Sequence, residues 1–231
     1  MRILIKIGSS LVSKNNKLNL KLLKSKIKEI SKLFKEENEI VLVSSGAVAS
    51  GMEIENLKER PRDTLSLQLL SGKGQIILIR HYQELFSKEG IKISQVLLTH
   101  HNFDREEENK TIVQILNAYL KQKTIPIINE NDLINKEELE HSNIFTDNDI
   151  LSAIVAKNLK VNLAIMLTDV AGLFDSNPKV NPNSKLIEEV CDFGKSIEKM
   201  ASKETNNLGV GGMYSKVLAA KMMAEEGIDV I

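Results

Sequence analysis

The stretch Arg2–Ser10, RILIKIGSS, decides the fold class expected for this chain. It begins as an apolar run in which Lys6 lies on the side opposite the isoleucines, and it ends in a Gly-Ser-Ser turn. Such a run is typical of a buried strand in a parallel sheet. Ligands of open α/β sheets collect at the carboxyl ends of strands, where a Gly-Ser turn exposes backbone N–H groups. We therefore predict that Lys6 faces an anion; a lysine on an edge strand is the alternative.

Five further apolar runs alternate with segments of helical period. The runs lie at residues 40–43, 91–98, 124–128, 163–167 and 228–231. The helical segments lie at 22–34 (with Asn19 as N-cap), 65–88 (where Gly72 and Gly74 predict a kink or tight packing), 114–120, 150–155 and 213–226; a loop is expected at 171–182. The alternation predicts an α/β fold, a three-layer αβα sandwich around an open, mostly parallel sheet. We treat residues 1–231 as one domain whose two lobes, about 1–150 and 151–231, share that sheet.

Composition excludes several classes of protein. Lys+Arg 31 and Asp+Glu 31 give a formal net charge of +0, which disfavours partners held by phosphate contacts, namely nucleic acid and anionic membrane surfaces. No apolar run approaches the ~20 residues that span a bilayer, and the amino terminus does not read as a signal peptide. The single cysteine, Cys191, forbids an intrachain disulfide. We therefore expect a cytoplasmic protein with no metal held by its own side chains.

Small or acidic side chains follow two more predicted strands and precede a predicted helix. Ser44 and Ser45 come before a helical start, where the helix dipole favours an anion, although a serine there can also be only an N-cap. Asn129–Asp132 follows a buried strand, and a solvated loop explains it equally well. Thr146–Asp149 precedes the helix at 150, where acidic residues also simply complement the dipole.

Two segments in the second half of the chain could bind a nucleotide. Thr168 and Asp169 end a predicted strand, which is a weak signal by itself. Gly209–Lys216 opens the last helix with neither the P-loop nor the dinucleotide spacing. Its glycines nevertheless allow successive N–H groups to converge on an oxyanion, which Lys216 would also reach. A flexible surface loop is the alternative.

Together these segments resemble the amino acid kinase family. The resemblance rests on IKIGSS (5–10), VSSGA (43–47), NEND (129–132), DND (147–149), LTDVAGL (167–173) and GGMYSK (211–216), which cover nearly the whole chain. The NEND run followed by DND points to the members that phosphorylate L-glutamate. Thr146 stands where glycine is usual and Val210 where threonine is usual, so loop geometry or a nucleotide contact could differ. We expect no C-terminal PUA domain, which some members carry.

The resemblance implies transfer of phosphate from ATP to the side-chain carboxylate of glutamate, giving γ-glutamyl phosphate, the first step of proline biosynthesis. A carboxylate is already ionised at neutral pH, so no general base is required, but two anions must be brought together. Lys6 and Lys216 would be catalytic and Asp149 would orient them. Glutamate would be held by Ser45, Asp132 and Asn148, with Asp132 on its ammonium group. ATP, with Mg²⁺ on its phosphates, would contact Lys6, Gly8, Ser9, Thr168, Asp169, Val210, Gly211, Gly212, Met213, Tyr214, Ser215 and Lys216.

Several alternatives stay open at this point. Uridylate kinase, acetylglutamate kinase and aspartokinase share the lysine and glycine apparatus. From another class, the chain could be a catalytically silent sensor of nucleotide or proline. A nicotinamide oxidoreductase fits less well, because Gly-Ser-Ser after the first strand lacks the required glycine spacing. The resemblance further implies a homo-oligomer, a dimer or tetramer, and feedback inhibition by proline.

Overall fold

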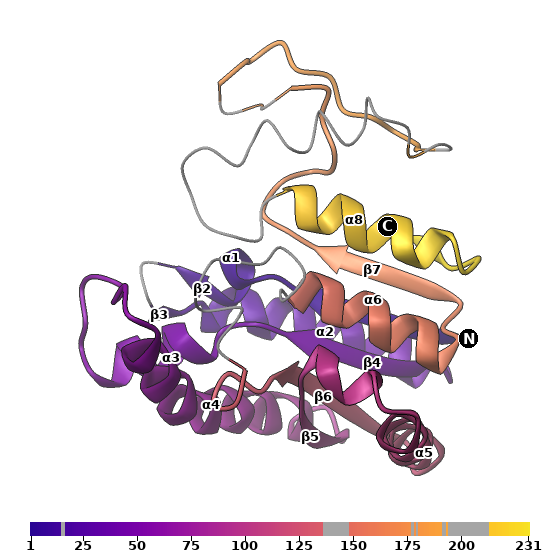
Figure 1. The fold of residues 1–231 in the computed structure, drawn as a ribbon, viewed down its shortest axis with the longest axis horizontal. Coiled ribbons are helices and arrows are strands. Elements are labelled where there is room, and N and C mark those ends of the chain that lie inside the picture. The colour runs from indigo at the N-terminus through magenta and orange to yellow at the C-terminus, as the bar shows by residue number, and fades with distance from the viewer. Residues whose placement is uncertain (15–16, 136–147, 177, 179, 191–192, 194–212) are drawn as a thin grey trace.

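A six-stranded parallel sheet forms the centre of the molecule (Figure 1). The computed structural model describes residues 1–14, 17–135, 148–176, 178, 180–190, 193 and 213–231. The strand order is β5-β6-β4-β1-β7-β8, and each neighbouring pair is parallel. The strands are β1 (Arg2–Ile7), β4 (Glu39–Ser44), β5 (Lys92–Leu98), β6 (Thr124–Glu130), β7 (Leu163–Leu167) and β8 (Asp229–Val230). All six predicted strands are confirmed, with boundaries that differ by at most two residues.

Helices cover both faces of this sheet, which confirms the three-layer prediction (Figure 1). They are α1 (Ser9–Val12), α2 (Leu20–Lys35), α3 (Ala47–Ile54), α4 (Thr64–Ser87), the 3-10 helix η1 (His100–Phe103), α5 (Glu106–Lys121), α6 (Asn148–Leu159) and α8 (Met213–Ala224). Because side chains alternate along a strand, β1 sends Leu4 into the core under α5, α6 and α8, and Ile3 and Ile5 into the core under α2 and α4. A small hairpin, β2 (Ser13–Lys14) with β3 (Lys17–Leu18), was not predicted.

The N-cap predicted for α2 is confirmed, because the Asn19 Oδ1 accepts a hydrogen bond of 3.3 Å from the Leu22 N–H. The kink suggested for 65–88 is wrong, since α4 is one uninterrupted helix. Tight packing was the correct alternative. A Cβ built on Gly74 would lie 1.9 Å from the Ala47 carbonyl oxygen, so glycine allows the backbones of α3 and α4 to touch.

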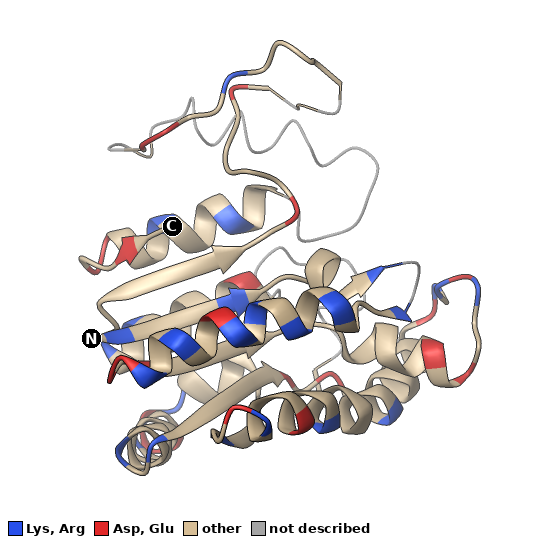
Figure 2. Cartoon of the chain, turned by 180° about the vertical axis from the view of Figure 1, so that it is seen from behind, with Lys and Arg blue, Asp and Glu red and all other residues tan. Residues whose placement is uncertain are grey.

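The segment after β7 leaves the sheet and rises above α8 (Figure 1). It has the loop character predicted for 171–182, with an isolated bridge between Phe174 and Leu186. Charges of both signs are spread over the outer helices, and lysines are frequent along α2 (Figure 2). In the described part of the chain, no helix is both long and apolar enough to cross a bilayer.

Candidate active site

Asp149 is the meeting point of two lysines that come from opposite ends of the sequence. The Lys6 ammonium contacts its Oδ1, and the Lys216 Nζ donates to its Oδ2 at 3.1 Å. The Ser215 hydroxyl donates to the same Oδ2 at 2.9 Å. The exposed fractions of these side chains are 0% for Asp149, 3% for Lys6 and 17% for Lys216. The structure therefore brings together the three residues expected to be catalytic.

The fold explains this meeting. β1 is a central strand between β4 and β7, so the alternative of an edge-strand lysine is wrong for Lys6. Lys6 points to the face of the sheet covered by α6 and α8, because it lies two residues from Leu4. These two helices lie side by side and begin at the same end of the sheet (Figure 1), which brings Asp149 and Lys216 in their first turns to the carboxyl end of β1.

In the contacts of the described residues, two ammonium groups face one carboxylate in this cluster. Burial by itself would raise the pKa of Asp149, but the charges of Lys6 and Lys216 and the bonds donated by Lys6 and Ser215 lower it further, so the pKa lies below its ordinary value. Asp149 is therefore ionised at neutral pH. The two lysines therefore bring positive charge to the carboxyl end of β1.

Small residues follow β1 and β4 at the same edge. The Gly8 N–H donates to the Leu167 carbonyl at 3.2 Å, so this amide serves the sheet rather than an anion, contrary to the expectation. Ser9 begins α1 and is exposed. The half-buried Ser45 donates its N–H to the Ile7 carbonyl at 3.3 Å.

The reading of Ser44 or Ser45 as only an N-cap is wrong. The N-cap position of α3 is Gly46, whose φ of 115° is in the left-handed region, and no side chain caps the helix. The Ser44 hydroxyl instead lies 2.7 Å from the Tyr82 hydroxyl and donates to the Ser45 carbonyl at 2.9 Å.

Asp132 lies after β6 and has a different environment from Asp149. Its side chain is buried, and the Ser71 hydroxyl donates to its Oδ2. Burial raises the pKa of Asp132 to about 6, although the Ser71 hydrogen bond and the Arg60 charge both lower it. The Asp132 carboxyl group therefore titrates close to neutral pH, and a nearby positive charge such as an ammonium group would favour its ionised form.

Asn148 opens α6 next to Asp149. Its Oδ1 is buried and has no hydrogen-bond partner in the described part of the chain. Buried polar atoms are almost always paired, so this acceptor is a candidate contact for a donor on a ligand.

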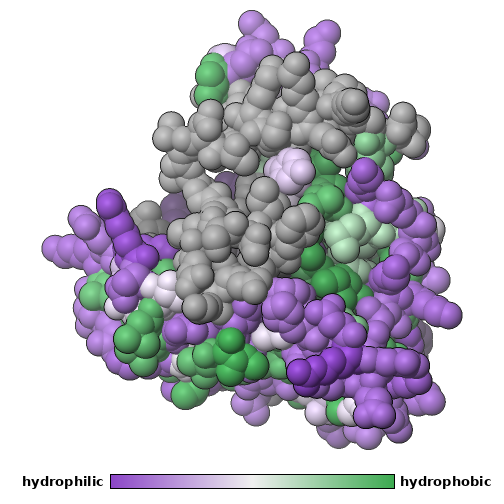
Figure 3. Space-filling model, in the orientation of Figure 1, coloured by the Kyte–Doolittle hydropathy of each residue, from purple (hydrophilic) through white to green (hydrophobic). Residues whose placement is uncertain are grey.

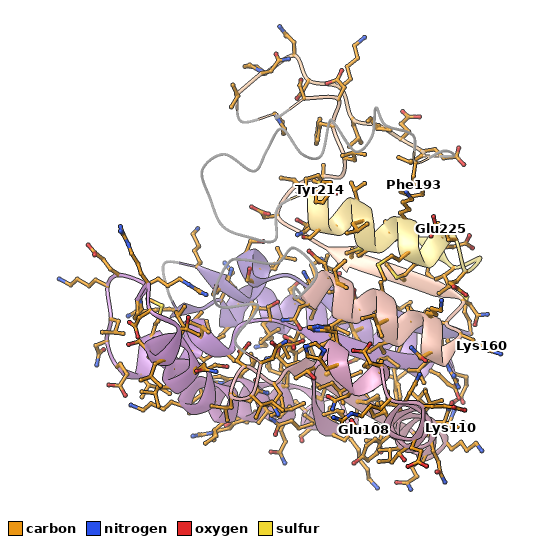
Figure 4. All side chains as sticks on the ribbon, viewed as in Figure 1. Glu108, Lys110, Lys160, Phe193, Tyr214 and Glu225 are labelled. Atoms are coloured by element: carbon orange, nitrogen blue, oxygen red, sulfur yellow. The ribbon has the colours of Figure 1, made fainter. Side chains whose placement is uncertain are left out.

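The nucleotide residues are only partly described. Val210, Gly211 and Gly212 lie outside the described residues, as do Thr146 and Asp147. Of the rest, Thr168 and Asp169 directly follow β7, with 3.4 Å between the Thr168 hydroxyl and the Asp169 Oδ1. Met213 and Tyr214 begin α8 and are half-buried; Figure 4 labels Tyr214 at that end of the helix.

No metal centre is evident in the described ranges, where no group of three His, Cys, Asp or Glu side chains is arranged to hold an ion. Two surface hollows, one at Lys92 and Thr124 and one at Lys157 and Glu226, are lined by none of the candidate residues. The first lies where β5 and β6 begin, at the opposite end of these strands from the site.

Sequence reasoning missed three residues of α4 that contact the end of β6 and the segment after it. They are Gln68 and Ser71, which bond to Asp132 and Leu133 after β6, and Gln75, which bonds to Asn129 near the end of β6. Their spacing was the available signal, since polar residues at i, i+3 and i+7 form a polar stripe on a largely apolar helix.

The comparisons with known proteins agree with this geometry. The sequence pattern described as the amino acid kinase family matches residues 1–231. The chain belongs to the amino acid kinase family. Within it, the chain is 39% identical over 227 residues to the glutamate 5-kinase of Ligilactobacillus salivarius and 37% identical over 231 residues to that of Lactococcus lactis subsp. lactis. It covers 85% and 86% of those relatives, and 61% of the glutamate 5-kinase of a Thermoanaerobacter species, to which it is 37% identical.

Solved structures support the fold of the family. An isopentenyl phosphate kinase aligns with a TM-score of 0.65 and 16% identity. The alignment covers 100% of this chain and 90% of the isopentenyl phosphate kinase chain. The carbamate kinase of Giardia lamblia bound to AMP-PNP aligns with a TM-score of 0.61 and 15% identity. The alignment covers 97% of this chain and 90% of the carbamate kinase chain. At such low identity these likenesses concern the fold alone.

Proposed function

We propose that the chain is a glutamate 5-kinase, which transfers the γ-phosphoryl group of ATP to the side-chain carboxylate of L-glutamate. The bond from the γ-phosphorus to the bridging oxygen of ADP breaks, and a bond from that phosphorus to a glutamate carboxylate oxygen forms. The products are ADP and γ-glutamyl phosphate, which places the reaction in proline biosynthesis. The chain spans only 61% of some relatives, so the activity is a proposal for this chain rather than a transfer from them.

One observation carries the proposal: Lys6 and Lys216, from opposite ends of the sequence, both contact the buried Asp149. Two anions, a phosphate chain and a carboxylate, repel each other as they approach, and preorganised cations in a buried site offset that repulsion and the charge that develops on the transferred group. Asp149 fixes both ammonium groups, so they do not have to reorganise during the reaction.

The remaining roles follow from the surroundings of each residue. Asp132 would accept from the glutamate ammonium group, and the orphan Asn148 Oδ1 would accept a donor from the same substrate. Ser45, at the end of β4, would complete the acceptor site. Thr168, Asp169 and the residues from Val210 to Lys216 would contact ATP, whose phosphates would carry Mg²⁺, since the described part of the chain offers no ligand set of its own for a metal.

Assembly, regulation and location complete the proposal. Leu65, Leu69 and Ile76 are exposed on α4, near Leu133 and Ile134 after β6, and Figure 3 shows apolar surface over this helix. A dimer or tetramer would cover such side chains. Light scattering in solution measures the molar mass and so tests whether the chain forms a dimer or tetramer. Proline as a feedback inhibitor and a cytoplasmic location are likewise proposals.

The deciding experiment measures ADP release from ATP and Mg²⁺ with glutamate, beside UMP, aspartate and N-acetylglutamate, each with and without proline. Hydroxylamine in a parallel reaction traps an acyl phosphate as a hydroxamate. We expect glutamate-dependent ADP release with a matching yield of hydroxamate. Release with another acceptor would reassign the substrate, and ligand-induced thermal stabilisation without ADP release would identify a silent sensor instead.

A further inference from the structure

One face of α4 holds the end of β6 and the polar segment after it in place. Four residues form this face, which we name the α4 clamp: Gln68, Ser71, Gly72 and Gln75. Their spacing of three and four residues aligns them along one side of the helix. The helix itself is anchored independently, because Leu67, Leu70, Gly74 and Leu78 pack into the core or against α3. The clamp is therefore a rigid support rather than part of a loop.

Each clamp residue contacts a different part of this stretch. The Gln68 Nε2 donates to the carbonyls of Asp132 (3.0 Å) and Leu133 (3.3 Å). The Gln75 Oε1 accepts from the Asn129 Nδ2 at 2.8 Å. Gly72 leaves room for the Leu133 side chain, whose Cδ2 would lie 3.1 Å from a Cβ at that position. These contacts hold the end of β6 and the backbone at Asp132 and Leu133 against α4.

Ser71 differs from the others because it contacts the carboxylate itself. Its hydroxyl donates to the Asp132 Oδ2, and both side chains are buried. A carboxylate in such a place is unfavourable unless donors or positive charges face it. Arg60, on the exposed segment between α3 and α4, is a positive charge that acts on it.

We propose that Ser71 is a positioning residue for the acceptor amino acid: its hydroxyl keeps the Asp132 carboxylate ionised and in one orientation, ready to accept from an ammonium group. The proposal rests on the function proposed above and adds to it. It adds a residue of α4 to the acceptor site, although none of the sequence motifs of the site lies on that helix. It also predicts that glutamate affinity depends on pH through a hydroxyl that never touches the substrate.

The test compares three variants of the full chain. Ser71→Ala removes the donor to the carboxylate, and Gln68→Ala removes the donors to the backbone. Ser87→Ala is the matched control, since Ser87 is an exposed serine at the far end of the same helix. Steady-state rates with glutamate and with ATP are measured from pH 5.5 to 8.5.

For Ser71→Ala we expect the KM for glutamate to rise about 10-fold at pH 6.5, with the KM for ATP within about 2-fold of the parent. The acid limb of kcat/KM for glutamate should move up by about 0.5–1 pH unit, so that the loss shrinks at pH 8.5. Gln68→Ala should raise the KM without moving the acid limb, because its donors serve backbone carbonyls. Ser87→Ala should match the parent.

An unshifted acid limb in Ser71→Ala, or equal losses for glutamate and ATP, would overturn the proposal, because a merely structural role predicts both. Should Ser71→Ala not fold, Ser71→Cys keeps the packing and weakens the donor, and the same shift is expected from it. Calorimetry with glutamate alone separates the two proposals. A parent that binds glutamate but releases no ADP contradicts only the kinase function, whereas a Ser71→Ala protein that binds glutamate as the parent does contradicts only the clamp.

Discussion

Two buried aspartates at the same edge of the sheet have opposite acid–base properties. Asp149 contacts Lys6 and Lys216, and its pKa is lowered despite burial. Asp132 contacts a neutral hydroxyl, and burial raises its pKa to about 6. The difference comes from the neighbours, because both side chains are almost completely removed from solvent.

This contrast assigns the two residues different tasks. A carboxylate neutralised by two cations is a fixed structural charge that orients them across the whole physiological pH range. A carboxylate that burial makes harder to ionise is destabilising until a positive charge faces it, and in the proposed function the ammonium group of glutamate would supply that charge. On that proposal, the donor and acceptor sites would use the same residue type for permanent and for conditional charge pairing.

The largest effect should come from Asp149→Asn. Removing one partner of a buried ion pair leaves two ammonium groups uncompensated, so the free energy of unfolding at pH 7 should fall by about 3–5 kcal/mol. The lowered pKa stabilises the fold above the ordinary value near 4, and this contribution is lost as pH falls from there through the folded pKa, so the difference between parent and variant should persist from pH 7 to about pH 4 and shrink only below it. Urea unfolding over a series of pH values from 7 downwards measures this. Equal stability at pH 7 would mean that the cluster does not form.

Next comes Lys216→Ala. It should lower kcat about 10²–10³-fold while changing the KM for glutamate little, because the ammonium acts on charge that develops during transfer. Lys6→Ala should lower kcat similarly and also destabilise the fold, since Lys6 is the more buried partner of Asp149. Lys157→Ala, on the outer surface of α6, is the control. Near-normal turnover in both site variants would remove the lysines from the mechanism.

Asp132→Asn should act in the opposite direction on stability. Because the pKa of Asp132 is raised in the folded protein, the free energy of unfolding falls as pH rises from about 4 to about 6. It stays lower at higher pH. Asparagine removes that penalty and can still accept from Ser71, so the free energy of unfolding at pH 7.5 should rise by about 1–3 kcal/mol, with no gain at pH 4. The KM for glutamate should increase, with ATP binding little changed. A selective loss of ATP affinity would show that the two lobes are assigned the wrong way round.

The smallest effect is expected for Tyr82→Phe. The Tyr82 hydroxyl is buried against Ser44, which keeps a second bond to the Ser45 carbonyl, so the loss should be about 1 kcal/mol. No charged group is involved, and the acid limb for glutamate should not move. A shift of that limb would mean that buried hydroxyls affect Asp132 generally and would weaken the specific role of Ser71.

Much of the fold could be predicted because the apolar pattern is strong. Buried strands such as Arg2–Ile7 and Glu39–Ser44 are apolar runs with sharp ends, and Asn19 caps its helix through a local contact. Of the two readings of Gly72 and Gly74, a kink or tight packing, the second is confirmed at Gly74, because the backbone of α3 occupies the space that its Cβ would need.

The candidate site was harder to predict because its contacts are distant in the sequence. The family resemblance implied that Asp149 orients Lys6 and Lys216, but nothing local in the sequence reveals that its carboxylate bonds to both of them. Ser71 was missed because a serine inside a helix carries no signal by itself. Its contact with Asp132 depends on where α4 lies relative to the end of β6, and only the tertiary packing determines that position.

A carbon NMR titration of protein labelled at the aspartate carboxyl carbons tests the contrast most directly. The account predicts one buried carboxyl that titrates near pH 6 and disappears in Asp132→Asn, and another, lost in Asp149→Asn, that stays ionised down to pH 4. A signal of Asp132 that titrates at the ordinary value near 4, or one of Asp149 that protonates above it, would contradict the account.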